Sequence, residues 1–169
     1  MTHSTHHSQR SLRLHLCDEA ATARLGQRLA GTLAPGLRIY LRGGLGAGKT
    51  TLARALLRAL GFPGRVKSPS YALVELYTVS SLNLYHFDFF RFRDPKEWSD
   101  AGFREYFSGN GVCLVEWPEK ARDVLPPADL EIHLSTAGAG RDASLTAQTE
   151  AGGKCLKAAS ELKSQDEFS

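Results

Sequence analysis

The sequence predicts an α/β domain in which helices flank a mostly parallel sheet that carries added antiparallel hairpin strands. Residues 37–42 alternate apolar and polar side chains, and residues 52–60 repeat leucine at helical spacing after an intervening glycine-rich loop. Two further pairs of strand-like segments, at 72–88 and 130–147, are joined by short polar turns, which predicts hairpins. With 169 residues, 42% hydrophobic and 23% charged, the chain has the size and composition of one globular domain.

Composition and charge restrict the class of protein. No apolar run approaches the roughly 20 residues of a membrane span, and no signal-peptide core lies near the start. Cys17, Cys113 and Cys155 form no C-x-x-C pair, which fits a reducing compartment and no structural zinc. The formal charge of +3 permits contact with nucleic acid but does not argue for it. We therefore expect a cytoplasmic protein with no membrane partner.

The first elements follow a polar N-terminal tail over residues 1–10. This tail holds three histidines, for which a frayed terminus is the expected state and a metal site the alternative. Leucine alternates with polar residues over 12–16, which predicts a strand. Asp18 then provides a cap for a helix whose apolar face runs from Ala21 to Leu33, before a Pro-Gly pair ends it.

Residues 43–51 read Gly-Gly-Leu-Gly-Ala-Gly-Lys-Thr-Thr, which fits the phosphate-binding pattern G-x-x-x-x-G-K-[ST]. Glycines let the backbone turn sharply and point successive N–H groups at an anion. Strand, loop and helix follow in the order that aims a helix N-terminus at phosphates, which disfavours a turn that binds nothing. The fold class is therefore P-loop NTPase-like. The predicted nucleotide contacts come from consecutive residues: Leu45, Gly46, Ala47, Gly48, Lys49, Thr50 and Thr51.

Mg²⁺ accompanies a triphosphate and prefers hard oxygen ligands, so the Thr50 hydroxyl is one candidate. In an open parallel sheet the ligand lies outside the C-terminal ends of the strands, where an acid is the expected helper. Asp88 and Glu116 each end an apolar strand, and each could hold the metal or orient the attacking water, with Lys49 neutralising the outer phosphates. The alternative for either acid is an ordinary surface carboxylate. His86 shares the face of Asp88 and could touch the site, although we expect it to pack or hydrogen-bond locally.

The remaining segments complete the domain. Ser68-Pro69-Ser70 is either a nucleotide-sensing segment or an ordinary turn. Asp94 and the following Pro-Lys-Glu have the start signals of a helix. The chain turns polar after the last hairpin, so we expect the ATPase domain over 11–150 and a polar tail or loose helix over 151–169. No N-K-x-D guanine reader appears, which favours ATP over GTP.

Four segments together resemble one family, the bacterial ATPase component of the tRNA threonylcarbamoyladenosine system, called TsaE or YjeE. The resemblance covers roughly residues 17–147, and order and spacing both match. The matching segments are Gly46–Thr51, Val66–Tyr71, Tyr85–Asp88 with Arg91, and Leu114–Pro118.

The resemblance implies ATP or ADP on the phosphate loop and Mg²⁺ bound by Thr50 and Glu116, with Asp88 beside the metal. It also implies that Thr22 and Arg141 lie near the adenine, and an arginine face can stack on a purine. The chain departs from the family at two positions in particular. Gly44 and Ser70 stand where aspartate and threonine are usual, although the serine keeps a hydroxyl.

The leading interpretation is a Mg²⁺-dependent ATPase, slow alone, that supports the complex forming threonylcarbamoyladenosine next to the anticodon. The implied partners are the threonylcarbamoyl-transferase subunit and its paralogous companion, with tRNA reached indirectly through the complex. A small-molecule kinase is the alternative, because such enzymes share the phosphate loop and Arg91 and Arg93 could form a lid. A third interpretation, a nucleotide-dependent interaction switch, differs only in its hydrolysis rate.

Overall fold

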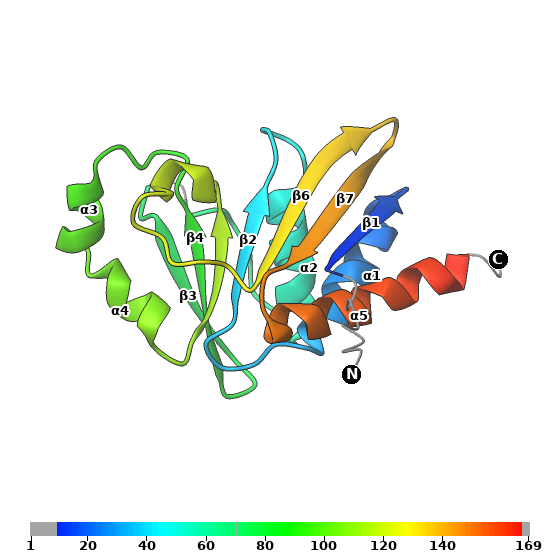
Figure 1. Ribbon diagram of the computed structural model, residues 1–169, viewed down its shortest axis with the longest axis horizontal. Helices are drawn as coiled ribbons and strands as arrows, with labels where there is room; N and C mark the ends of the chain where they lie inside the picture. The colour runs from blue at the N-terminus through cyan, green and yellow to red at the C-terminus, as the bar shows by residue number, and fades with distance from the viewer. Residues whose placement is uncertain (1–9, 70, 167–169) are drawn as a thin grey trace, which may run out of the picture.

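A seven-stranded mixed sheet positions the residues of interest (Figure 1). The computed structural model describes residues 10–69 and 71–166, so expectations about residues 1–9, Ser70 and residues 167–169 lie outside it. The strands lie in the order β1-β7-β6-β2-β5-β4-β3. Their bounds are β1 Ser11–Leu16, β2 Arg38–Arg42, β3 Val74–Val79, β4 Leu82–Asp88, β5 Val112–Glu116, β6 Leu130–Ala137 and β7 Gly140–Ala147.

The sheet is parallel at its centre and antiparallel at both edges. The pairings β6–β2, β2–β5 and β5–β4 are parallel, whereas β1–β7, β7–β6 and β4–β3 are antiparallel. The two predicted hairpins are therefore confirmed. The prediction of a mostly parallel sheet is wrong, because the hairpins and β1 supply as many pairings as the parallel centre does.

Alternating side chains of the central strands build one core on each face of the sheet. Ile39 and Leu41 of β2 enter the core that α1 (Glu19–Ala30), α2 (Lys49–Ala59) and α5 (Glu150–Asp166) cover. Tyr40, between them, enters the opposite core. Aromatic rings from α3 (Pro95–Asp100) and α4 (Phe103–Ser108) fill that second core beside the short helix η1 (Pro118–Ala121). Figure 1 shows the two helix groups on opposite sides of the sheet.

Two predicted helix starts are confirmed by their capping hydrogen bonds. The backbone N–H of Ala21 donates to the Asp18 carboxylate at 2.8 Å, and α1 begins there. Asp94 caps α3 in the same way, and the Glu97 side chain accepts from the Asp94 backbone in return. Such contacts satisfy N–H groups that the first turn of a helix leaves unpaired. Local sequence therefore determines where these helices begin.

The C-terminal segment, for which we expected a polar tail or a loose helix over 151–169, forms a packed helix. Residues 150–166 form the α5 helix, which packs on the sheet and on α1. Cys155, Leu156, Ala159 and Leu162 are buried there because their spacing places them on one helical face. Polar residues lie between these positions, so the composition of the segment did not reveal its apolar helical face. Within residues 10–69 and 71–166, none of the helices combines the length and apolar character that crossing a membrane requires.

Candidate functional site

The glycine-rich loop leaves the C-terminal end of β2 and enters α2 directly. Gly43 and Gly48 have φ of 147° and 103°, in the left-handed region that disfavours residues with a Cβ atom. A Cβ at Gly43 would also collide with the carbonyl oxygen of Leu134, and one at Gly48 with the guanidinium of Arg141. Backbone conformation thus favours glycine at both ends of the loop, and at Gly43 the Leu134 backbone also leaves no space for a Cβ atom.

Lys49 is the first residue of α2, and its side chain turns back into the loop. Its Nζ donates to the carbonyl oxygens of Gly43 and Gly44, at 2.8 Å for Gly44, and lies 4.2 Å from the centre of the Trp117 ring. Burial lowers the pKa of this ammonium group, against the opposing attraction of nearby carboxylates, with Glu116 first among them. The Lys49 ammonium group therefore lies buried inside the loop, where two carbonyl oxygens and the face of the Trp117 ring are its partners.

The two predicted acids lie side by side. β4 and β5 are parallel neighbours, and their register pairs Asp88 with Glu116 at the C-terminal end of each strand. Both are buried, at 6% and 2% exposure. The Thr50 hydroxyl lies 3.0 and 3.1 Å from the two Glu116 oxygens. Glu116 therefore joins the start of α2 to the end of β5 through its contacts with the Thr50 hydroxyl.

Asp88 has a separate set of contacts. Its Oδ2 accepts a hydrogen bond from the Ser68 hydroxyl, and its Oδ1 accepts one from the Phe90 backbone N–H at 2.9 Å. The segment that could sense a nucleotide is therefore tied to the acid at the end of β4. Of the two hydroxyls in that segment, the structure describes only Ser68.

His86 contacts the site, contrary to the expectation of local packing. Its side chain is fully buried, and its Nε2 lies 2.6 Å from Glu116 Oε2, across 30 positions of sequence. A histidine two residues before a strand-end acid shares its face, which was the available signal. Which acid it would meet depends on the β4–β5 register, and the sequence does not reveal that register.

Thr22 and Arg141 meet at the opposite side of the loop. Arg141 leaves the start of β7 and passes over Gly48, and its Nη1 lies 3.5 Å from the Thr22 hydroxyl. Thr22 is fully buried in α1, whereas Arg141 is half-buried. The structure thus brings together the two residues that the resemblance places near the base.

The comparison with known families decides what kind of protein carries this arrangement. The family model described as "Threonylcarbamoyl adenosine biosynthesis protein TsaE" matches residues 16–143. The chain belongs to the TsaE family.

Individual TsaE relatives support the same assignment. A tRNA threonylcarbamoyladenosine biosynthesis protein TsaE from Haemophilus influenzae is 40% identical over 153 residues, covering 88% of this chain and 97% of that protein. The TsaE from Bacillus subtilis is 39% identical over 117 residues, covering 69% and 73%. A crystal structure of Bacillus subtilis YdiB matches with a TM-score of 0.77 and 30% identity, over 91% of this chain and 97% of that one. The α/β architecture is therefore shared with a solved relative.

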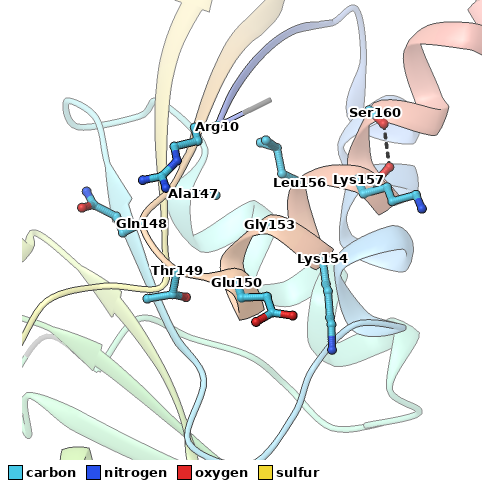
Figure 2. A pocket seen from close by; sticks show the side chains of 10 residues that line it. All are labelled: Arg10, Ala147, Gln148, Thr149, Glu150, Gly153, Lys154, Leu156, Lys157 and Ser160. Carbon is cyan, nitrogen blue, oxygen red and sulfur yellow. Dashed lines mark hydrogen bonds between the residues drawn. The ribbon is translucent and has the colours of Figure 1, made fainter. Parts of the chain in front are cut away.

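A cavity of about 680 Å³ lies elsewhere on this TsaE family member, at the start of α5 (Figure 2). Its walls include Arg10, Glu150, Lys154 and Lys157, but no residue of the phosphate loop or of the strand ends at 88 and 116. Figure 2 shows the amino groups of the two lysines pointing away from the Arg10 guanidinium, so the cations do not converge on one ligand. We therefore place the candidate site at the glycine-rich loop and the two strand-end acids and not at this cavity.

Proposed function

We propose that this chain is a Mg²⁺-dependent ATPase of P-loop type that supports the tRNA-modifying complex forming threonylcarbamoyladenosine next to the anticodon. The observation that carries the proposal is the contact of the Thr50 hydroxyl with both Glu116 oxygens, one helical residue beyond Lys49. A hydroxyl from the phosphate loop and a carboxylate from a neighbouring strand end are the protein groups that accompany Mg²⁺ in such enzymes. A cytoplasmic location is part of the proposal.

The residues present fit Mg²⁺. Thr50 and Glu116 offer hard oxygen atoms directed at each other, at 3.0 and 3.1 Å. Among residues 10–69 and 71–166, no group of three or more His, Cys, Asp and Glu side chains is arranged to hold a metal. That agrees with an ion that keeps several waters and takes its other ligands from substrate phosphates. When bound, Mg²⁺ would neutralise charge that develops on the phosphate oxygens.

Lys49 and Asp88 have distinct roles in the proposed hydrolysis. Lys49 exchanges the Gly43 and Gly44 carbonyls for the outer phosphates, so that its charge acts where negative charge accumulates. Asp88 orients the attacking water in this proposal, whereas Glu116, which contacts the Thr50 hydroxyl and His86, would hold the metal. The water oxygen bonds to the outer phosphorus, the bond to the bridging oxygen breaks, and ADP and phosphate leave. The water protons pass to phosphate and solvent.

The adenine end of the site belongs to Thr22 and Arg141 in this proposal. The guanidinium of Arg141 lies over Gly48, where it can present a flat cationic face to a purine next to the phosphates. The loop backbone from Leu45 to Thr51 binds the phosphates between the two ends. Of the two candidate lid arginines, Arg91 and Arg93, the first has its Cζ 4.6 Å from the centre of the Tyr71 ring and is engaged there. We therefore propose the ATPase in preference to a small-molecule kinase.

The proposed partners are the threonylcarbamoyl-transferase subunit and its paralogous companion, with tRNA reached through them. Steady-state phosphate release should be slow for the isolated chain and rise when both subunits are added. Partner-supplied groups raise such rates by about 10³–10⁵ in the best-studied switches. An unchanged rate with both subunits, together with stoichiometric phosphorylation of a metabolite, would reject the proposal in favour of a kinase.

A further inference from the structure

His86 occupies a position that packing alone does not explain. It faces the same side of β4 as Leu84, which enters the apolar core beneath α2. An apolar side chain would fill that position without any hydrogen-bond requirement. The imidazole is fully buried, and its Nδ1 has no hydrogen-bond partner among the described residues. A buried polar group is costly unless a partner compensates for it, so the other ring nitrogen must provide the reason for histidine.

That other nitrogen, Nε2, faces a carboxylate that needs a fixed orientation. Glu116 ends β5 at 2% exposure, and its carboxylate has two neighbours. His86 Nε2 lies 2.6 Å from Oε2, and the Thr50 hydroxyl contacts both oxygens from the opposite side. A carboxylate accepts hydrogen bonds, so Nε2 carries the donated proton. The bond restricts rotation of the carboxylate, both oxygens of which contact the Thr50 hydroxyl.

We propose that His86 is a positioning residue for Glu116, holding Oε2 through its Nε2–H so that the carboxylate meets a divalent cation in one orientation. The inference rests on the proposed metal site at Thr50 and Glu116. Outer partners of this kind fix the geometry of a ligand before the metal arrives, and their removal weakens metal affinity by about 10–100-fold. Asp88, on the same strand, lacks this support and takes its hydrogen bonds from Ser68 and Phe90 instead.

The first test measures Mn²⁺ affinity in the ADP complex by electron paramagnetic resonance. His86→Leu should weaken Mn²⁺ binding by about 10–100-fold, whereas ADP affinity in EDTA should stay unchanged. His86→Gln should recover most of the loss, because its amide N–H can occupy the place of Nε2. His133→Leu is the matched control, since His133 is exposed on β6. A folded His86→Leu variant with wild-type Mn²⁺ affinity would overturn the inference.

The second test needs neither metal nor a disruptive variant. In the ¹⁵N-labelled, metal-free protein, the His86 ring should show a protonated Nε2 and a bare Nδ1, and Glu116→Gln should shift the Nε2 resonance. An Nε2 signal indifferent to Glu116→Gln would overturn the inference even if His86→Leu failed to fold. If the ADP complex of the wild type bound no Mn²⁺, the proposed metal site itself would be overturned. If the wild type and His86→Leu bound Mn²⁺ equally well, only the role of His86 would be overturned.

Discussion

The two ends of the candidate site differ in burial and in the length of their hydrogen bonds. At the acid end, adjacent parallel strands place Asp88 and Glu116 side by side, both buried and held by several short hydrogen bonds. At the base end, Arg141 is half-buried and approaches Thr22 at 3.5 Å, the limit of a hydrogen bond. Buried, hydrogen-bonded groups are therefore concentrated where charge would change in the proposed hydrolysis, and the contacts at the base end are looser.

The largest expected effect comes from removing the cation between the two ends. Lys49→Ala should lower ATP affinity by about 100-fold or more, because charge-assisted hydrogen bonds contribute roughly 1.5–3 kcal/mol each and this lysine makes more than one. Isothermal titration calorimetry measures the loss, with Lys96→Ala as an exposed control on α3. Wild-type ATP affinity in Lys49→Ala would contradict the assignment of the loop.

The acid end should affect chemistry more than binding. Asp88→Ala and Glu116→Ala should each lower the rate of ATP hydrolysis by about 100-fold or more, since both act on the attacking water or on Mg²⁺. Their ATP affinities should fall much less, and Glu116→Ala should also weaken the response to Mg²⁺ concentration. Phosphate release and calorimetry on the same preparations separate the two quantities. Glu105→Ala, an exposed acid on α4, is the control.

If both alanine variants hydrolysed ATP at the wild-type rate, the metal and water would have to be held by other residues. If only Glu116→Ala lost its Mg²⁺ response, the division of labour between the two acids would be confirmed. These outcomes sharpen the comparison, because they separate the metal ligand from the water-orienting carboxylate within one end of the site.

Arg141→Ala should have a smaller effect, confined to the base end. A desolvated cation–π contact contributes roughly 0.5–2 kcal/mol, so ATP affinity should fall by about 2–30-fold. Affinity for inorganic tripolyphosphate, which has no base, should stay unchanged. Arg13→Ala, on the exposed side of β1, is the matched control. Equal losses for ATP and tripolyphosphate would show that Arg141 acts on the phosphates instead.

The same contrast describes what could be predicted from sequence. The glycine-rich loop between β2 and α2 could be located because its pattern lies in consecutive residues, and the strand-end acids at 88 and 116 could be nominated from pattern alone. Their adjacency, and the meeting of His86 with Glu116, depend on strand register between segments about 30 residues apart. The apolar face of α5 was missed because polar neighbours obscured its period. The antiparallel pairing of β1 with β7 was missed because it joins segments at opposite ends of the chain, whereas the two hairpins join neighbouring segments.

The smallest expected effect is a pH dependence that arises from Lys49, the cation between the acid end and the base end. Burial disfavours the charged form of Lys49 and lowers its pKa below the usual 10.5, so the ammonium loses its proton at a lower pH than an exposed lysine would. Tripolyphosphate affinity depends on that charge, and it should therefore fall as the pH rises through the lowered pKa. The sign for stability is opposite: the unfolded chain binds this proton more tightly, so the contribution of Lys49 to the free energy of unfolding rises with pH between the lowered pKa and 10.5.

Calorimetric titration with tripolyphosphate from neutral to alkaline pH should show a several-fold loss of affinity. Arg141→Ala should lose affinity in parallel with the wild type, because a guanidinium stays charged throughout. An affinity that is flat with pH in the wild type, or a decline that disappears in Arg141→Ala, would place the titrating group outside the phosphate loop.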